Sequence, residues 1–173
     1  YAMFDEGRYF AWGDCVRAFD TRFGRMGMLI CEDFWHMSPP YLLWLDGADT
    51  LLLQSSSPAR GMTHAPFLSS MQSVDQLAST YAGMFTCFVA HANRVGFEDG
   101  MNFFGGSALY TPDGEQQISA PFMDEALVLA EVDTNQLHRS RARLPLLRDE
   151  RTALMLREMQ RIVDSQITAA PSR

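Results

Sequence analysis

The stretch MGMLICEDFWH, residues 26–36, joins an apolar run to a cysteine and two acidic residues. Residues 26–31 are apolar almost throughout, which is typical of a strand covered on both faces of a sheet. Cys31 would then lie where the strand ends, and open α/β sheets bind their ligands at that carboxyl edge. The local sequence leaves two interpretations open for Cys31, a catalytic nucleophile and a buried, inert thiol.

Strands and helices are predicted to alternate on either side of this run. We expect a helix that begins near Pro39 and ends at Gly47, and an amphipathic helix over 68–84. The other predicted strands are 16–21, 48–55, 85–92, a pair around the Pro-Asp-Gly turn of 107–118, and 126–133. Residues 93–106 have the composition of a polar, glycine-rich loop. The pattern predicts an α/β fold, a sheet covered by helices and extended by an antiparallel part.

Composition narrows the class of protein. The chain has 173 residues, 47% of them hydrophobic, which suits one soluble domain with a proper core. The formal net charge is −7 and the basic residues do not gather into one stripe, so nucleic acid is not an expected partner. No apolar run is long enough for a membrane span, and no signal peptide is recognisable. All 14 basic residues are arginine, so the chain contains no lysine.

The cysteines and histidines do not suggest a metal site. Cys15, Cys31 and Cys87 are an odd number of widely spaced cysteines, which argues against a disulfide framework or structural zinc and predicts a cytoplasmic protein. No two of the four histidines have the spacing of metal ligands, so we expect no metal and no cofactor.

A catalytic cysteine would need a base. The four histidines are His36, His64, His91 and His138, and no spacing singles one out, so a Cys–His hydrolase of another α/β fold stays an alternative. Glu6, ahead of the first strand, has aromatic neighbours and could be a surface residue or a partly buried one.

Several motifs agree in order and spacing with a known family. FDEGRYF, ICEDFW, LLWLDGADTLLLQSSSPARGM and ANRVGFEDGMNFFGGSALYTPDGE together resemble the nitrilase, or carbon–nitrogen hydrolase, superfamily over residues 1–133. FDEGRYF and ICEDFW are most similar to the branch with the glutaminase domains of glutamine-dependent NAD synthetases and free-standing amidohydrolases. The resemblance implies a four-layer αββα sandwich, of which 1–133 would be the C-terminal portion without the N-terminal strands and helices.

The resemblance also implies a Glu–Lys–Cys triad. Cys31 matches the nucleophile, which attacks an amide or nitrile carbon and forms a thioester acyl-enzyme. Glu32 matches the residue whose backbone N–H completes the oxyanion hole, while Asp33 is expected to anchor the turn. Glu6 matches a second, supporting glutamate. Trp35 is expected to line the substrate pocket or the core around it.

The triad glutamate and lysine have no match in this chain. In the family both come from segments upstream of the position of Tyr1, and the chain has no lysine to replace the missing one. We therefore expect the C-terminal part of a longer hydrolase that is inactive by itself. A non-catalytic pseudoenzyme or interaction module is a further alternative.

The expected substrate is a small carboxamide, with water as the second reactant. Tyr1 and Ser57 match positions that hold glutamine in the glutaminase branch, but Thr63 stands where that branch has a basic residue. No synthetase sequence follows, so we expect an amidase rather than a glutamine-fed synthetase. Residues 134–173 are expected to form a helical tail at the subunit interface of a homodimer or larger assembly.

Overall fold

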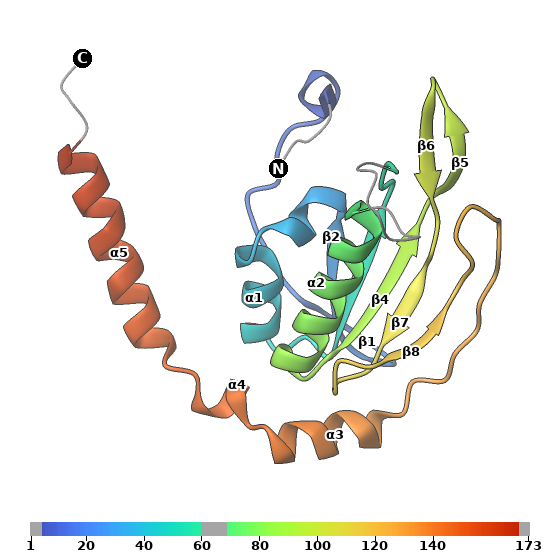
Figure 1. The fold of residues 1–173 in the computed structure, drawn as a ribbon. Helices are drawn as coiled ribbons and strands as arrows, with labels where there is room; N and C mark the ends of the chain where they lie inside the picture. Colours follow the sequence, from blue (N-terminus) through green and yellow to red (C-terminus); the bar gives the residue numbers. More distant parts are fainter. Residues whose placement is uncertain (1–4, 60–68, 170–173) are drawn as a thin grey trace.

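The computed structural model describes residues 5–59 and 69–169, which fold into a mixed sheet with helices (Figure 1). In chain order the elements are η1 (Asp5–Arg8), β1 (Phe19–Thr21), β2 (Gly24–Ile30), η2 (Cys31–Trp35), α1 (Ser38–Leu45), β3 (Thr50–Ser55), α2 (Ser69–Phe85), β4 (Phe88–Asn93), β5 (Val95–Glu98), β6 (Met101–Phe104), β7 (Ala108–Tyr110), β8 (Gln116–Ser119), α3 (Thr134–Arg143), α4 (Leu146–Asp149) and α5 (Thr152–Ala169).

The main sheet has the strand order β1-β2-β3-β4-β7-β8. Its centre is parallel, because β2 pairs with β3 and β3 pairs with β4 in parallel register. The strands β1, β7 and β8 are antiparallel to their neighbours. This confirms the predicted α/β fold with an antiparallel part, and the central strands are the three apolar runs predicted from the sequence. The expectation that residues 26–31 are covered on both faces is not met in the described residues, since Met28 and Ile30 are exposed.

Both α1 and α2 pack on one face of this sheet (Figure 1). Leu29, Leu51 and Val89, from the three parallel strands, point into that layer and are at most 1% exposed. Gly27 on β2 allows α1 to approach closely, since a Cβ at that position would lie 2.7 Å from Leu43. The core therefore sits between the sheet and these two helices.

The opposite face of the sheet is apolar and open. Met28 and Ile30 alternate with the buried residues of β2 and are 54% and 58% exposed. A hollow of about 870 Å³ lies on this face, and its mainly apolar lining includes Leu52, Ala90 and Leu127. In the described part of the chain, the main sheet and the helices on its one face form two layers, whereas the predicted sandwich has four.

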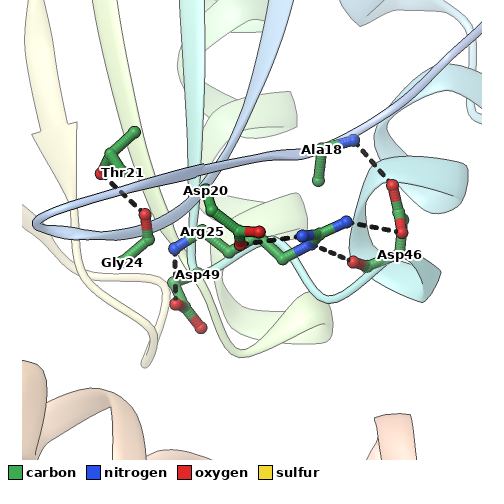
Figure 2. A network of polar contacts seen from close by, with 7 residues as sticks. All are labelled: Ala18, Asp20, Thr21, Gly24, Arg25, Asp46 and Asp49. Carbon is green, nitrogen blue, oxygen red and sulfur yellow. Dashed lines mark hydrogen bonds and ion pairs between the residues drawn. The ribbon is translucent and has the colours of Figure 1, made fainter.

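A polar network fixes the amino end of the sheet (Figure 2). Arg25 on β2 donates from its guanidinium to Asp20 at 2.8 Å and to the Asp46 carboxylate at 2.9 Å. Asp46 also accepts from the Ala18 backbone N–H at 2.8 Å, and these bonds lower the pKa of its carboxyl group. Asp49 accepts from the backbone N–H of Arg25 at 3.0 Å. These contacts join β1 and β2 to the segment between the carboxyl end of α1 and the start of β3.

The tail contains α3, α4 and α5, and the first of these helices packs on the sheet domain. Leu137 of α3 is buried against Phe88 and Leu109. Arg141 of α3 donates to Asp49 at 2.8 Å, an ion pair close to the amino ends of β3 and β4. By contrast, α5 extends away from the sheet in Figure 1.

Two predicted segments differ from the structure. Residues 93–106, predicted as a loop, contain the antiparallel hairpin β5–β6, whose Asp99-Gly100 turn has both residues at positive φ. Residues 126–133, predicted as a strand, are not in a strand, and Leu127 and Leu129 are 86% and 80% exposed. Apolar composition is not enough for a strand, because each strand needs a neighbour to pair with its backbone groups.

Candidate active site

Cys31 lies at the carboxyl edge of the sheet, on the turn where β2 passes into η2. Its φ is +46°, a left-handed backbone conformation that is rare for a residue with a side chain. Residues held in such conformations cost of the order of 1–3 kcal/mol and cluster at functional sites. Thr86, Asp99 and Met123 also have positive φ. Cys31 has intermediate exposure, between buried Cys87 and exposed Cys15.

The two acidic residues after Cys31 have different surroundings. Asp33 accepts a hydrogen bond from the Ile30 backbone N–H at 3.0 Å, which confirms that it anchors the turn. One carboxylate oxygen of Glu32 lies 3.3 Å from Nε2 of His36. Its second oxygen, Oε2, is buried and has no hydrogen-bond partner in the described structure. The Glu32 carboxylate is therefore an acceptor next to the candidate nucleophile.

Trp35 was expected to line the substrate pocket or the core around it, and the structure shows different surroundings for Phe34 and Trp35. Phe34 is 1% exposed and meets Tyr81 of α2 edge-to-face, with ring centroids 5.0 Å apart. Trp35 is 41% exposed. The core contact is therefore made by Phe34, and Trp35 lies at the surface at the end of η2.

The neighbouring strand ends bring a buried polar cluster to the same edge. Ile30 is in register with Gln54, so Cys31 follows at the level of Ser55, and Ser55 is in register with Asn93. The Ser55 hydroxyl lies 2.7 Å from Nε2 of His91 and 3.1 Å from the Ser57 hydroxyl. Ser55, Ser57 and His91 are 8%, 7% and 4% exposed.

The structure places only some of the sequence-predicted site residues. Cys31, Glu32, Trp35 and Ser57 lie on two adjacent strand ends, β2 and β3. Tyr1 lies outside the described residues, and Thr63 and His64 do too. Glu6 belongs to η1, but its side chain is also outside what is described. The roles of all these residues stay predictions.

Sequence reasoning missed Asn93. This residue was assigned to the start of a loop, whereas it ends β4 and bonds to the chain segments after β3 and β6. Aligning the carboxyl ends of the parallel strands would have pointed to it, because Ser55 and Asn93 each close an apolar run.

The described histidines differ in their surroundings. His91 is engaged with Ser55, and burial lowers its pKa to about 4. His138 is exposed on α3, which packs at the amino end of the sheet. His36 pairs with Glu32.

The described residues include no group of three histidine, cysteine or acidic side chains placed to bind a metal ion. In ranges 5–59 and 69–169, no helix has the length and apolar character needed to cross a membrane.

The mixed sheet with helices on one face defines a class of α/β domain, with Cys31 at the carboxyl edge of the sheet, and comparison with known proteins specifies the family. The family model for carbon-nitrogen hydrolases matches residues 2–142. This chain belongs to the carbon–nitrogen hydrolase family.

Individual relatives agree with this assignment. A glutamine-dependent NAD(+) synthetase of Acinetobacter baylyi is 29% identical over 136 residues, which are 79% of this chain and 24% of the relative. An N-carbamoylputrescine amidase of Arabidopsis thaliana is 26% identical over 160 residues, 87% of this chain and 53% of the relative.

A solved carbon-nitrogen hydrolase from Helicobacter pylori G27 superposes with a TM-score of 0.76 at 26% identity, covering 86% of this chain and 54% of that one. This similarity confirms the nitrilase-type fold. The chain thus spans between a quarter and about half of the length of these relatives.

Proposed function

We propose that this chain carries the nucleophile of a thiol amidohydrolase. Cys31 would attack the carbonyl carbon of a small carboxamide, and the C–N bond would break as the amine or ammonia leaves with a proton. Water would then hydrolyse the thioester and release the acid. The observation that carries the proposal is the strained backbone of Cys31 at the carboxyl edge of a sheet of this family.

The other catalytic roles are proposed as the family resemblance implies them. The Glu32 backbone N–H, in the first turn of η2, would bind the oxyanion, because the first N–H groups of a helix lack partners within it. Glu6 would support the site. The base and the cation would be a glutamate and a lysine from the part of the hydrolase that the relatives have upstream of this region.

Substrate contacts are proposed for Tyr1, Trp35 and Ser57. The relatives act on chemically different amides, glutamine in the NAD(+) synthetase and N-carbamoylputrescine in the amidase, as their names state. We propose a small linear carboxamide for this enzyme, hydrolysed in the cytoplasm by a homodimer without a cofactor. The exposed apolar stripe of α5 and the three widely spaced cysteines support the assembly and the compartment.

The experiment measures ammonia release by the full-length gene product from propionamide, glutamine and N-carbamoylputrescine. Cys31→Ala should lower the rate at least about 1000-fold, since no other group replaces a covalent nucleophile. Cys15→Ala is the matched control, because Cys15 is an exposed cysteine with no proposed role, and it should keep the rate.

Mass spectrometry of the enzyme quenched during turnover should show the acyl group on the peptide that contains Cys31. Equal rates for the Cys31→Ala variant and the unmodified protein would refute the proposal. Absence of hydrolysis for all three amides, together with no acylation, would favour the pseudoenzyme alternative.

A further inference from the structure

Asn93 joins three segments at the carboxyl edge of the sheet. Its side-chain oxygen accepts from the Ser57 backbone N–H at 3.0 Å and from the Ser55 hydroxyl at 2.8 Å. Its side-chain nitrogen donates to the Gly105 carbonyl at 2.7 Å, and its backbone N–H donates to the Ser107 hydroxyl at 2.9 Å. One amide thus connects the chain after β3, the end of β4 and the chain after β6.

These partners fix the direction of every hydrogen bond in the cluster. The Asn93 amide has only one orientation, because a backbone N–H needs its oxygen and a carbonyl needs its nitrogen. Ser55 has a single hydroxyl proton, and it goes to the Asn93 oxygen. The Ser55 oxygen must therefore accept from His91, which requires a proton on Nε2.

The direction of the hydrogen bond between Ser55 and Ser57 also follows from the number of available protons. Since the Ser55 proton is already used, the Ser57 hydroxyl donates across the 3.1 Å between the two oxygens. The result is a continuous arrangement in which His91 donates to Ser55, Ser55 donates to Asn93, and both polar groups of Ser57 donate into the cluster. Each hydrogen bond among these four residues then has one donor and one acceptor, as buried polar groups require.

We propose that His91, Ser55 and Asn93 are positioning residues that hold Ser57 in its place beside the candidate nucleophile. Their assignment rests on the proposed function, in which Ser57 contacts the substrate and Cys31 reacts with it. In this arrangement His91 acts as a fixed neutral donor rather than as the base of a Cys–His pair, and Asn93 sets the path of the 55–59 backbone.

The kinetic test compares His91→Leu, His91→Gln and Ser55→Ala in the full-length protein, with the fastest of the three amides named above. His91→Leu and Ser55→Ala should raise KM about tenfold and change kcat less than threefold, as expected for loss of a substrate-positioning contact. His91→Gln should restore KM to within about threefold, because its side-chain N–H can replace the Nε2–H donor. An unchanged KM in folded His91→Leu overturns the proposal.

Two readouts do not depend on catalysis. The ¹⁵N shifts of His91 should show a proton on Nε2 and none on Nδ1 at pH 7, and an Nδ1–H tautomer overturns the proposal. Amide hydrogen exchange of Ser57 should be at least about tenfold faster in His91→Leu than in the unmodified protein and normal in His91→Gln. An equal exchange rate in the Leu variant overturns it as well.

Failure of the proposed function gives a different result. The protein could hydrolyse none of the amides and still show the Nε2–H tautomer and the predicted exchange rates. This result contradicts the proposed function but supports the positioning of Ser57. The opposite result is hydrolysis that depends on Cys31 together with a normal KM and normal Ser57 exchange in His91→Leu. This result supports the proposed function and contradicts the positioning role of His91, Ser55 and Asn93.

Discussion

Cys31 and Cys87 differ in their surroundings. Cys31 follows β2 with a φ of +46° and intermediate exposure, and both features support its proposed role as the nucleophile. Cys87 provides the contrast within the same chain, because it is fully buried and its burial raises its pKa to about 12. A thiol with that pKa is almost entirely protonated at neutral pH and is a poor nucleophile.

The buried imidazole of His91 makes stability depend on pH. Its pKa is lowered to about 4 by burial, from an ordinary value of 6.5 in the unfolded chain. Between these values the unfolded state binds more protons, so stability is complete above about pH 6.5 and falls as the pH drops toward 4.

We expect the free energy of unfolding to lose at most roughly 3 kcal/mol from this group over that range. The measurement is urea unfolding between pH 4 and 7. The His91→Gln variant should show a flatter pH profile, whereas His138→Gln, at an exposed position, should not. Parallel profiles for His91→Gln and the unmodified protein would contradict the assignment.

Gly27 tests the packing of α1 on β2. A Cβ there would lie 2.7 Å from Leu43, so Gly27→Ala should lower the free energy of unfolding by about 1–3 kcal/mol through overpacking. Gly13→Ala is the matched control, since nothing lies within 4 Å of a Cβ at that position. Equal urea midpoints for the two variants would show that the contact relaxes without cost.

At the scale of elements, the three parallel strands determine where the site lies. Because β2, β3 and β4 run in the same direction, their carboxyl ends place Cys31, Ser55 and Asn93 along one edge of the sheet. The amino ends of these strands are fastened separately, through Arg25 and Asp49. The candidate site and the polar network of Arg25 and Asp49 therefore lie at opposite ends of the parallel strands.

Arg141 connects α3 to that amino edge. It donates to the Asp49 carboxylate at 2.8 Å, to the Ala48 carbonyl at 2.9 Å and to the Thr86 carbonyl at 3.3 Å. Arg141→Met keeps the apolar stem but removes these bonds, and it should cost about 1.5–3 kcal/mol of stability.

Hydrogen exchange of the α3 amides is the specific measurement for this variant, because it should become faster when the helix loosens from the sheet. Arg139→Met is the control. Arg139 pairs with Asp133 while its side chain is 67% exposed, so its loss should change stability by less than about 1 kcal/mol. Equal effects of the two substitutions would argue against docking of α3 through Arg141.

On the scale of the whole molecule, two apolar surfaces lack cover in the described structure. One is the open face of the main sheet with Met28 and Ile30, and the other is one side of α5. The sheet face is where the predicted sandwich would place its second sheet. A single sheet with one helix layer leaves these side chains in water, which is unfavourable for the isolated chain.

The proposed homodimer predicts that α5 contributes to the subunit interface. Its exposed apolar stripe consists of Leu156, Met159, Val163 and Ile167, which lie on one side of the helix. Replacing Met159 and Val163 by Asp should convert the dimer of the full-length protein into a monomer, as measured by light scattering after gel filtration.

Charge at the subunit interface is the intended cause, so Arg157→Asp and Ser165→Asp together serve as the control, because both positions lie away from the apolar stripe of the same helix. That pair should leave the dimer intact. A dimer that persists with Asp at both 159 and 163 would exclude α5 from the interface.

The sequence by itself determined the fold class, the apolar strands at the centre of the sheet and Cys31 as the residue at its carboxyl edge. The apolar runs are local patterns that can be read from the sequence. They are residues 26–31, 48–55 and 85–92, and segments with helical periodicity separate them. Their order and their helices allow few topologies, so the position of Cys31 followed from the chain alone.

Only the tertiary structure decided what depends on neighbours distant in sequence. The hairpin of 95–104 needs its paired backbone, 126–133 finds no strand to pair with, and the cluster of His91, Ser55 and Asn93 exists because β3 lies beside β4. Periodicity reports which face of an element is apolar. Pairing, backbone strain and the direction of hydrogen bonds are set by the partners that folding brings together.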